Sequence, residues 1–384
     1  MRDAVGELQA SKIREVANAG LGRDDVLAFW FGEGDVVTPD FVRQAAVASI
    51  EAGETFYSHN LGLPELRAAV AAMLSEQHGH VSERRLAMTS GGVNALMVAV
   101  QTLVDPGDKV VCVAPVWPNL PAQARLLSAD LHLHALVVKD GAWTLDVDAL
   151  IRQLGTDTRL LILNAPNNPT GWTMQPQDQQ ALLEHCRRHG TWILSDEVYS
   201  HLYYEPSANG CAPSFLDHAQ PEDRLIVVGS FSKSFWMTGW RLGWLVLPES
   251  LTEQVGKLIE FNTSCLSVFV QRAGLAALSQ RHTLVPQTRN HLRQCRDTLI
   301  PALNALPRFQ VATPAAGLYA FFRIPGHSDG LDVAKRLVRE AGLGLAPGEA
   351  FGERSDGWLR WCFATRDLNR LTQGVERLHK WLGL

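Results

Sequence analysis

Residues 230–244, SFSKSFWMTGWRLGW, carry one lysine, Lys233, in a stretch whose only other charge is Arg241. The apolar runs 225–229 and 241–247 on either side are each typical of a buried strand. Lys233 is therefore expected on a tight connection between two strands, crowded by aromatic side chains. Burial disfavours the charged form of a lysine and lowers its pKa, and a neutral amine is a nucleophile. Taken alone, the pattern is equally compatible with an ordinary lysine on the surface of a loop.

Strand-like and helix-like patterns alternate through the middle of the chain. Continuous apolar runs occur at 110–115, 131–138, 160–164 and 191–197, and residues 175–189 have apolar positions on one helical face. Such strands, separated by helices, are typical of a parallel sheet covered on both faces, so we predict an α/β fold. Ligands of these folds bind at the carboxyl ends of the strands.

The last third of the chain changes character. A long helical stretch, 251–299, precedes short strand-like pieces at 317–322 and 358–363, and the helical patterns 331–341 and 367–382 frame them. This arrangement predicts a smaller α+β domain.

Composition limits the function. The chain has 384 residues, 46% hydrophobic and 20% charged, as in ordinary globular proteins. A net charge of −5 makes a nucleic-acid partner unexpected. No apolar run approaches the roughly 20 residues of a membrane span, and residues 1–7 show no secretory signal. The six cysteines are scattered without a C-x-x-C pair, which favours reduced thiols in the cytoplasm over disulfides or a metal site.

The 230–244 segment resembles the lysine signature of pyridoxal-phosphate (PLP) aminotransferases of classes I and II, which have fold type I. The pattern is Ser230-x-x-Lys233, with Arg241 eight residues later and Leu-Gly after it. The resemblance implies that Lys233 holds PLP covalently and that Ser230 and Arg241 bind its phosphate, with Ser232 beside them. Trp236 stands where the family usually has a small residue.

The resemblance also implies an architecture. A large PLP-binding domain, 45–285, would hold a mostly parallel central sheet flanked by helices. Residues 1–44 and 286–384 would form the smaller α+β domain.

Two strand ends match further family motifs. Residues 164–171, NAPNNPTG, form a turn by composition, and the match to Asn-Pro-Thr-Gly implies that Asn168 bonds the phenolic oxygen of PLP and borders the substrate. Asp196 follows an apolar run, so from the residues alone it is either a helix cap or a buried charge with a partner. By resemblance, Asp196 pairs with the ring nitrogen, and Tyr199 donates to the same oxygen as Asn168.

The segment 89–96, TSGGVNAL, places small residues ahead of a helical run at 95–103. Free N–H groups at a helix start bind anions, although a Gly-Gly pair also marks ordinary turns. By resemblance, Gly91, Gly92 and Val93 form the phosphate loop. Trp117 follows the strand at 110–115 and would stack on the PLP ring, the alternative being a core tryptophan.

Three more matches concern the substrate and a partner subunit. Tyr57, in a Tyr-x4-Gly-x-Pro-x-Leu-Arg stretch, would reach the phosphate of a neighbouring subunit, which implies a homodimer with a shared active site. Gly32, in Gly-Glu-Gly-Asp, would approach the substrate carboxylate through its backbone, and Gly34 replaces the usual proline. Arg360 lies in an apolar strand-like run, where an unpaired charge is costly. By resemblance it binds the α-carboxylate, with a structural ion pair as the alternative.

The implied activity is transfer of an amino group between an L-amino acid and a 2-oxo acid with ping-pong kinetics, Lys233 serving as base and acid in turn. A PLP-dependent C–S β-lyase shares the fold, but Asn167 and Thr170 favour transamination. A non-catalytic PLP-binding regulator would carry a DNA-binding segment, for which the residues before Gly32 leave no room.

The substrate itself is less well specified. Family members specific for dicarboxylates can use a second arginine, and the corresponding region, 261–269, contains none. That absence disfavours the usual aspartate-type pocket. The aromatic residues Trp30, Phe31, Trp117 and Trp236 favour an aromatic or aliphatic substrate.

Overall fold

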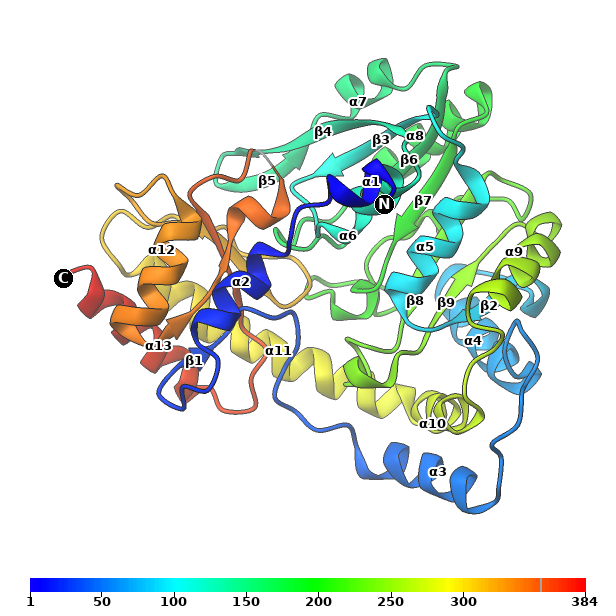
Figure 1. Cartoon of the computed structure of the whole chain (residues 1–384), viewed down its shortest axis with the longest axis horizontal. Coiled ribbons are helices and arrows are strands. Elements are labelled where there is room, and N and C mark those ends of the chain that lie inside the picture. The colour runs from blue at the N-terminus through cyan, green and yellow to red at the C-terminus, as the bar shows by residue number, and fades with distance from the viewer. Residues whose placement is uncertain (353) are drawn as a thin grey trace.

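The computed structural model describes residues 1–352 and 354–384 and places eight strands in one sheet. In chain order these strands are Leu86–Thr89 (β2), Lys109–Ala114 (β3), Asp130–Lys139 (β4), Ala142–Leu145 (β5), Thr158–Asn164 (β6), Trp192–Asp196 (β7), Leu225–Ser230 (β8) and Gly243–Val246 (β9). Their spatial order is β2-β9-β8-β7-β6-β3-β4-β5 (Figure 1). The five strands β4, β3, β6, β7 and β8 run parallel, and β5, β9 and β2 add antiparallel pairs at the edges. The predicted α/β fold with a mostly parallel sheet is confirmed.

Helices cover both faces of this sheet. Alternate residues of each strand enter opposite cores, as Val111 and Val110 of β3 show, and this explains why the strands read as unbroken apolar runs. The helices are Asp3–Gly6 (α1), Lys12–Ala19 (α2), Asp40–Glu51 (α3), Pro64–His78 (α4), Gly92–Leu103 (α5), Asn119–Leu126 (α6), Val147–Gln153 (α7), Pro176–His189 (α8), Glu249–Asn262 (α9), Val268–Ser279 (α10), Arg281–Asn304 (α11), Gly330–Arg336 (α12) and Asn369–Trp381 (α13). One core includes residues of α4, α8 and α10, and the other includes residues of α5, α6 and α9. Within the described residues, no helix has the length and apolar character that a membrane crossing demands.

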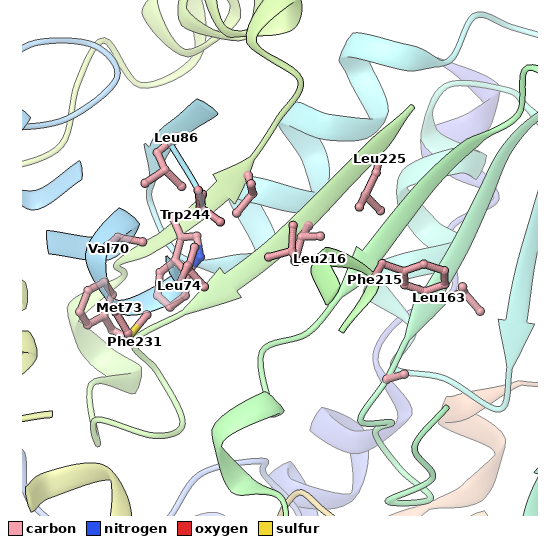
Figure 2. Packing of buried hydrophobic residues seen from close by; sticks show 14 of the residues in the cluster. Val70, Met73, Leu74, Leu86, Leu163, Phe215, Leu216, Leu225, Phe231 and Trp244 are labelled. Atoms are coloured by element: carbon pink, nitrogen blue, oxygen red, sulfur yellow. The ribbon is translucent and has the colours of Figure 1, made fainter. Parts of the chain in front are cut away.

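Figure 2 shows the first of these cores where the sheet meets α4. Leu86 of β2 and Trp244 of β9 lie against Val70, Met73 and Leu74 of α4, and all five side chains are buried. Each such side chain contributes about 1.5–3 kcal/mol through burial of apolar surface. This packing fixes the antiparallel edge of the sheet, and β9 is the strand that returns from the Lys233 loop.

A third core lies beside the sheet. It is built on the antiparallel strands Tyr319–Arg323 (β10), Trp358–Cys362 (β13) and Ala346–Pro347 (β12). A parallel pair, Leu27–Ala28 (β1) with Leu343–Gly344 (β11), brings the amino-terminal segment to the carboxy-terminal one (Figure 1). Side chains from α2, α11, α12 and α13 complete the core. The domain boundaries expected from the sequence, 1–44, 45–285 and 286–384, stay a prediction.

Two expectations about local structure were wrong. The helical stretch 251–299 is divided into α9, α10 and α11, and the left-handed φ of 60° at Ser264 accounts for the break between the first two. The second strand beside Lys233 begins at Gly243 and not at residue 241, because Arg241 has a φ of 53°, which a strand cannot contain.

Candidate active site

A cavity of about 600 Å³ opens at the carboxyl ends of three neighbouring parallel strands. Asn164, Asp196 and Ser230 are the last residues of β6, β7 and β8, and all three line it. Strand ends of an α/β sheet are where such folds bind ligands. All the site residues predicted from the sequence line this cavity except Gly91 and Tyr57.

Lys233 lies on the loop that joins β8 to the antiparallel β9, as the sequence predicted. Its Nζ donates a hydrogen bond to the carbonyl oxygen of Gly32 at 2.7 Å. Burial lowers the pKa of Lys233 to about 8. The fully buried rings of Phe231 and Phe235 pack in the same loop. The side chain therefore ends in the cavity as an amine that is easily deprotonated.

Asp196 is a buried acid with little to neutralise it. Its side chain accepts one hydrogen bond among the described residues, from the Val198 N–H at 3.3 Å. Burial, with a smaller contribution from the nearby charge of Glu197, raises the pKa of the carboxyl to about 7. A positively charged group in the cavity would offset this desolvation.

Asn168 and Tyr199 form a hydrogen-bonded pair. The Asn168 Nδ2 donates to the Tyr199 hydroxyl at 3.4 Å, and the Asn168 Oδ1 accepts from Arg360 Nη1 at 3.0 Å. Asn164, which the sequence analysis did not single out, accepts from the Asn168 N–H at 2.8 Å and so holds the turn in place. Its position at the end of a predicted strand was the available signal.

A further part of the cavity lining is suited to an anion. Gly92 begins α5, so its first N–H groups are free. The guanidinium of Arg241 lies over Gly91, where an added Cβ atom would collide with it. Ser230 and Ser232 line the same region, their hydroxyls 3.0 Å apart. Arg241 itself has a left-handed backbone, with a φ of 53°.

Arg360 lies on β13 and is only 1% exposed. Its Nη2 donates to the carbonyl oxygen of Trp30 at 2.6 Å, and its Nε has no partner among the described residues. No carboxylate of the described chain pairs with it. Each Nη nitrogen also has a second N–H beyond these bonds, and a guanidinium with such donors fits an incoming carboxylate, which it can bind in bidentate fashion.

The structure adds a residue that the sequence analysis missed. Tyr319, at the start of β10, lines the cavity, and its hydroxyl lies 2.8 Å from that of Tyr199. From the sequence, an aromatic residue in a short strand could equally belong to the core, and no local signal separates the two.

Three of the predicted aromatic residues lie elsewhere. Tyr57 is 89% exposed on the segment between α3 and α4, outside the cavity. Trp30 and Trp236 do not line the cavity, whereas Phe31 and Trp117 do. The aromatic lining available to a substrate is therefore smaller than the sequence suggested.

These residues fit PLP. The cavity offers an anion site of N–H groups, hydroxyls and one guanidinium for a phosphate. It also offers a buried acid for a ring nitrogen and amide and phenol groups for an oxygen. The lysine with a lowered pKa suits the cofactor's aldehyde.

Comparisons with known proteins identify the family. The family described as aminotransferase class I and II matches residues 28–378. The chain is 31% identical to an aspartate aminotransferase of Thermotoga maritima, over 98% of both chains. It is 29% identical to a probable aspartate/prephenate aminotransferase of Aquifex aeolicus, over 97% of this chain and 94% of the relative. The solved structure of aspartate aminotransferase from Thermus thermophilus with maleate superposes with a TM-score of 0.90 at 28% identity, covering 99% of both chains. The chain therefore belongs to the aminotransferase class I and II family and is a PLP-dependent aminotransferase.

Proposed function

We propose that Lys233 is the attachment point of PLP and the acid and base of the transamination. The observation that carries this proposal is the Nζ of Lys233, which lies in the cavity with a pKa near 8. Asp196 would face the ring nitrogen, Asn168 and Tyr199 the phenolic oxygen, and Trp117 the ring face. The phosphate would be held by the set Gly91, Gly92, Val93, Ser230, Ser232 and Arg241.

When bound, PLP supplies a ring that withdraws electrons from the substrate α-carbon. The chain's own residues then place and move protons. The Asp196 carboxylate keeps a proton on the group that faces it, because the buried charge is stabilised by a neighbouring cation. The Lys233 Nζ takes the proton from the α-carbon, since a pKa near 8 leaves a useful neutral fraction at neutral pH.

Gly32 and Arg360 would fix the substrate. Arg360 lines the cavity from a buried position, and each Nη nitrogen keeps a second N–H beyond its bond to Asn168 or Trp30. Gly32 lies beside Lys233, whose Nζ bonds its carbonyl oxygen. A carboxylate held here places the neighbouring α-carbon within reach of the lysine. Holding the reacting atoms in this way lowers the entropic part of the barrier.

A dicarboxylic amino acid is the substrate class that we propose. Two relatives carry aspartate in their names, and the Thermus thermophilus relative was solved with maleate. Residues 261–269 lack an arginine, but Arg14 lines the cavity with its guanidinium 5.5 Å from the centre of the Phe31 ring. No acidic side chain of the described residues pairs with Arg14, so it is free to bind a second carboxylate.

We propose a homodimer in the cytoplasm. Phe56, Tyr57 and Phe261 are 84–90% exposed, and large aromatic side chains left open to water mark an interaction surface. A second copy covering them would bring Tyr57 to its partner's phosphate site. All six cysteines are free, which suits a reducing compartment.

The absorption spectrum of the purified protein tests the central proposal. The lysine-linked cofactor should give a visible band that bleaches when aspartate or glutamate is added. Lys233→Ala should lack that band and lose turnover by several orders of magnitude, whereas Lys257→Ala, at an exposed lysine paired with Glu253, should keep both. Near-normal turnover in Lys233→Ala would refute the assignment. Release of pyruvate and ammonia from a cysteine conjugate, without bleaching by any amino acid, would indicate a lyase.

A further inference from the structure

Tyr319 joins the two sides of the active site. It is 1% exposed, and its hydroxyl lies 2.8 Å from that of Tyr199. The same hydroxyl touches Gly32 so closely that a Cβ atom at that position would collide with it. Tyr319 thus lies between the residue that would face the cofactor oxygen and the residue that would face the substrate carboxylate, and the transamination described above leaves it without a role.

The surrounding groups settle where protons lie. A guanidinium can only donate, so the atom of Asn168 that faces Arg360 Nη1 at 3.0 Å must be the amide oxygen. The amide nitrogen therefore faces Tyr199 and donates to its oxygen. Tyr199 has one proton, which goes either to Tyr319 or into the cavity.

We propose that Tyr319 is a positioning residue that donates its hydroxyl proton to Tyr199 and thereby directs the Tyr199 proton at the phenolic oxygen of PLP. The proposal rests on the proposed function, in which Tyr199 faces that oxygen. A phenol that accepts hydrogen bonds from two donors is polarised and becomes a stronger donor itself. Tyr319 and Asn168 are those two donors, and they leave Tyr199 a single direction in which to donate.

The ring of Tyr319 has a separate task. The Arg360 Cζ lies 4.4 Å from the centre of this ring, so the guanidinium rests on its face. Phenylalanine keeps the ring and removes only the hydroxyl. Tyr319→Phe therefore separates the effect on Tyr199 from the support of Arg360.

The pH dependence of the cofactor spectrum is the readout. Donors to the phenolic oxygen stabilise its negative charge and so favour loss of the proton that it shares with the lysine-linked nitrogen. Tyr319→Phe weakens the Tyr199 donor, so the midpoint of the spectral transition should rise by about 0.3–1 pH unit, the equivalent of one neutral hydrogen bond. The kcat should fall by about two- to tenfold. The KM for the amino acid should be unchanged, because Arg360 still packs on the aromatic ring at position 319.

Tyr203→Phe is the matched control, because its hydroxyl bonds no described residue and does not line the cavity. It should leave both the midpoint and kcat as in the wild type. A second test places Tyr319→Phe in a Tyr199→Phe background, where it should shift the midpoint no further, since its effect passes through Tyr199.

The results that would refute the proposed function differ from those that would refute the role of Tyr319. A wild-type protein without a visible band would refute the proposed function. A normal wild-type band whose midpoint is unmoved by Tyr319→Phe would refute the positioning role alone. An equal shift with and without the Tyr199 hydroxyl would show that Tyr319 acts on the cofactor directly, and that result would also overturn the proposal.

Discussion

Trp236 fills the space that a side chain at residue 34 would need: a Cβ atom at Gly34 would lie 2.8 Å from Cζ3 of Trp236. These are the two positions at which the chain departs from the pattern that it otherwise resembles, a small residue at 236 and a proline at 34. The departures are one packing arrangement. The large side chain is accommodated because its neighbour has none.

This pairing predicts coupled stabilities. Gly34→Ala should lower the free energy of unfolding by about 1–3 kcal/mol, the usual cost of overpacking, and the same change in a Trp236→Ala background should cost much less. Denaturant unfolding of the four proteins measures the coupling. Gly239→Ala is the control, since an added Cβ there meets nothing within 4 Å. Equal costs in both backgrounds would contradict the pairing.

Asp196 predicts how the stability of the apo protein varies with pH. Its pKa is about 7 in the folded protein and near 4 in the unfolded chain, so the folded protein holds the proton more tightly. The free energy of unfolding is therefore highest below about pH 4 and falls as the pH rises toward 7. The loss amounts to up to about 4 kcal/mol. Thermal unfolding of cofactor-free Asp196→Asn should lack this loss, so the variant should exceed the wild type in stability at pH 8.

Asp24→Asn controls for the charge change in that experiment, because Asp24 is exposed. Parallel pH profiles for the wild type and Asp196→Asn would show that the carboxyl is not held at a raised pKa. After PLP is added, the wild type should gain more stability than Asp196→Asn, since only the wild type places a negative charge beside the ring nitrogen.

Lys233 predicts the pH dependence of cofactor capture. With a pKa of about 8, about one in ten molecules has a neutral amine at pH 7, against fewer than about one in a thousand for an ordinary lysine. The rate at which the apo protein gains its visible band should rise with pH and level off by about pH 9. A rate that continues to climb toward pH 10 would mean an unperturbed amine.

We expect Arg360→Lys to bind its amino-acid substrate more weakly. A lysine lacks the planar fork of a guanidinium, so it cannot bind a carboxylate through two parallel hydrogen bonds while also bonding Asn168 and Trp30 as Arg360 does. The KM for amino acids should rise by about tenfold or more, which initial-rate kinetics would measure. Arg336→Lys, at an exposed ion pair with Glu340, should leave the KM unchanged. An unaltered KM in Arg360→Lys would place the carboxylate elsewhere.

Tyr57 predicts dependence on a second copy. Because its side chain is 89% exposed and outside the cavity of its own chain, Tyr57→Ala can weaken PLP binding only through a partner. Equilibrium dialysis should show a higher Kd for PLP, and sedimentation should show a dimer in the wild type. Leu21→Ala, at another exposed apolar residue, is the control. A monomer with full PLP affinity would exclude the shared site.

Local patterns were enough to predict the strand ends and the Lys233 loop. Asp196 directly follows an apolar run, but its role and that of Asn168 came from the family resemblance. The structure brings both residues to one cavity. The meeting of Tyr319 with Tyr199 could not be predicted in this way, because the two residues lie 120 positions apart. Their contact depends on how β10 is placed against the large sheet, which no local pattern contains.

The left-handed backbone of Arg241 lowers stability at a position that the phosphate site needs. An L-residue with a φ of 53° carries roughly 1–2 kcal/mol of steric cost that glycine avoids. Replacing Arg241 by glycine should therefore relieve the strain in the loop and raise the free energy of unfolding. The phosphate site would at the same time lose its only guanidinium among the described residues. A search for heat-resistant variants would select against the cofactor at this position unless holoenzyme activity were scored together with melting temperature.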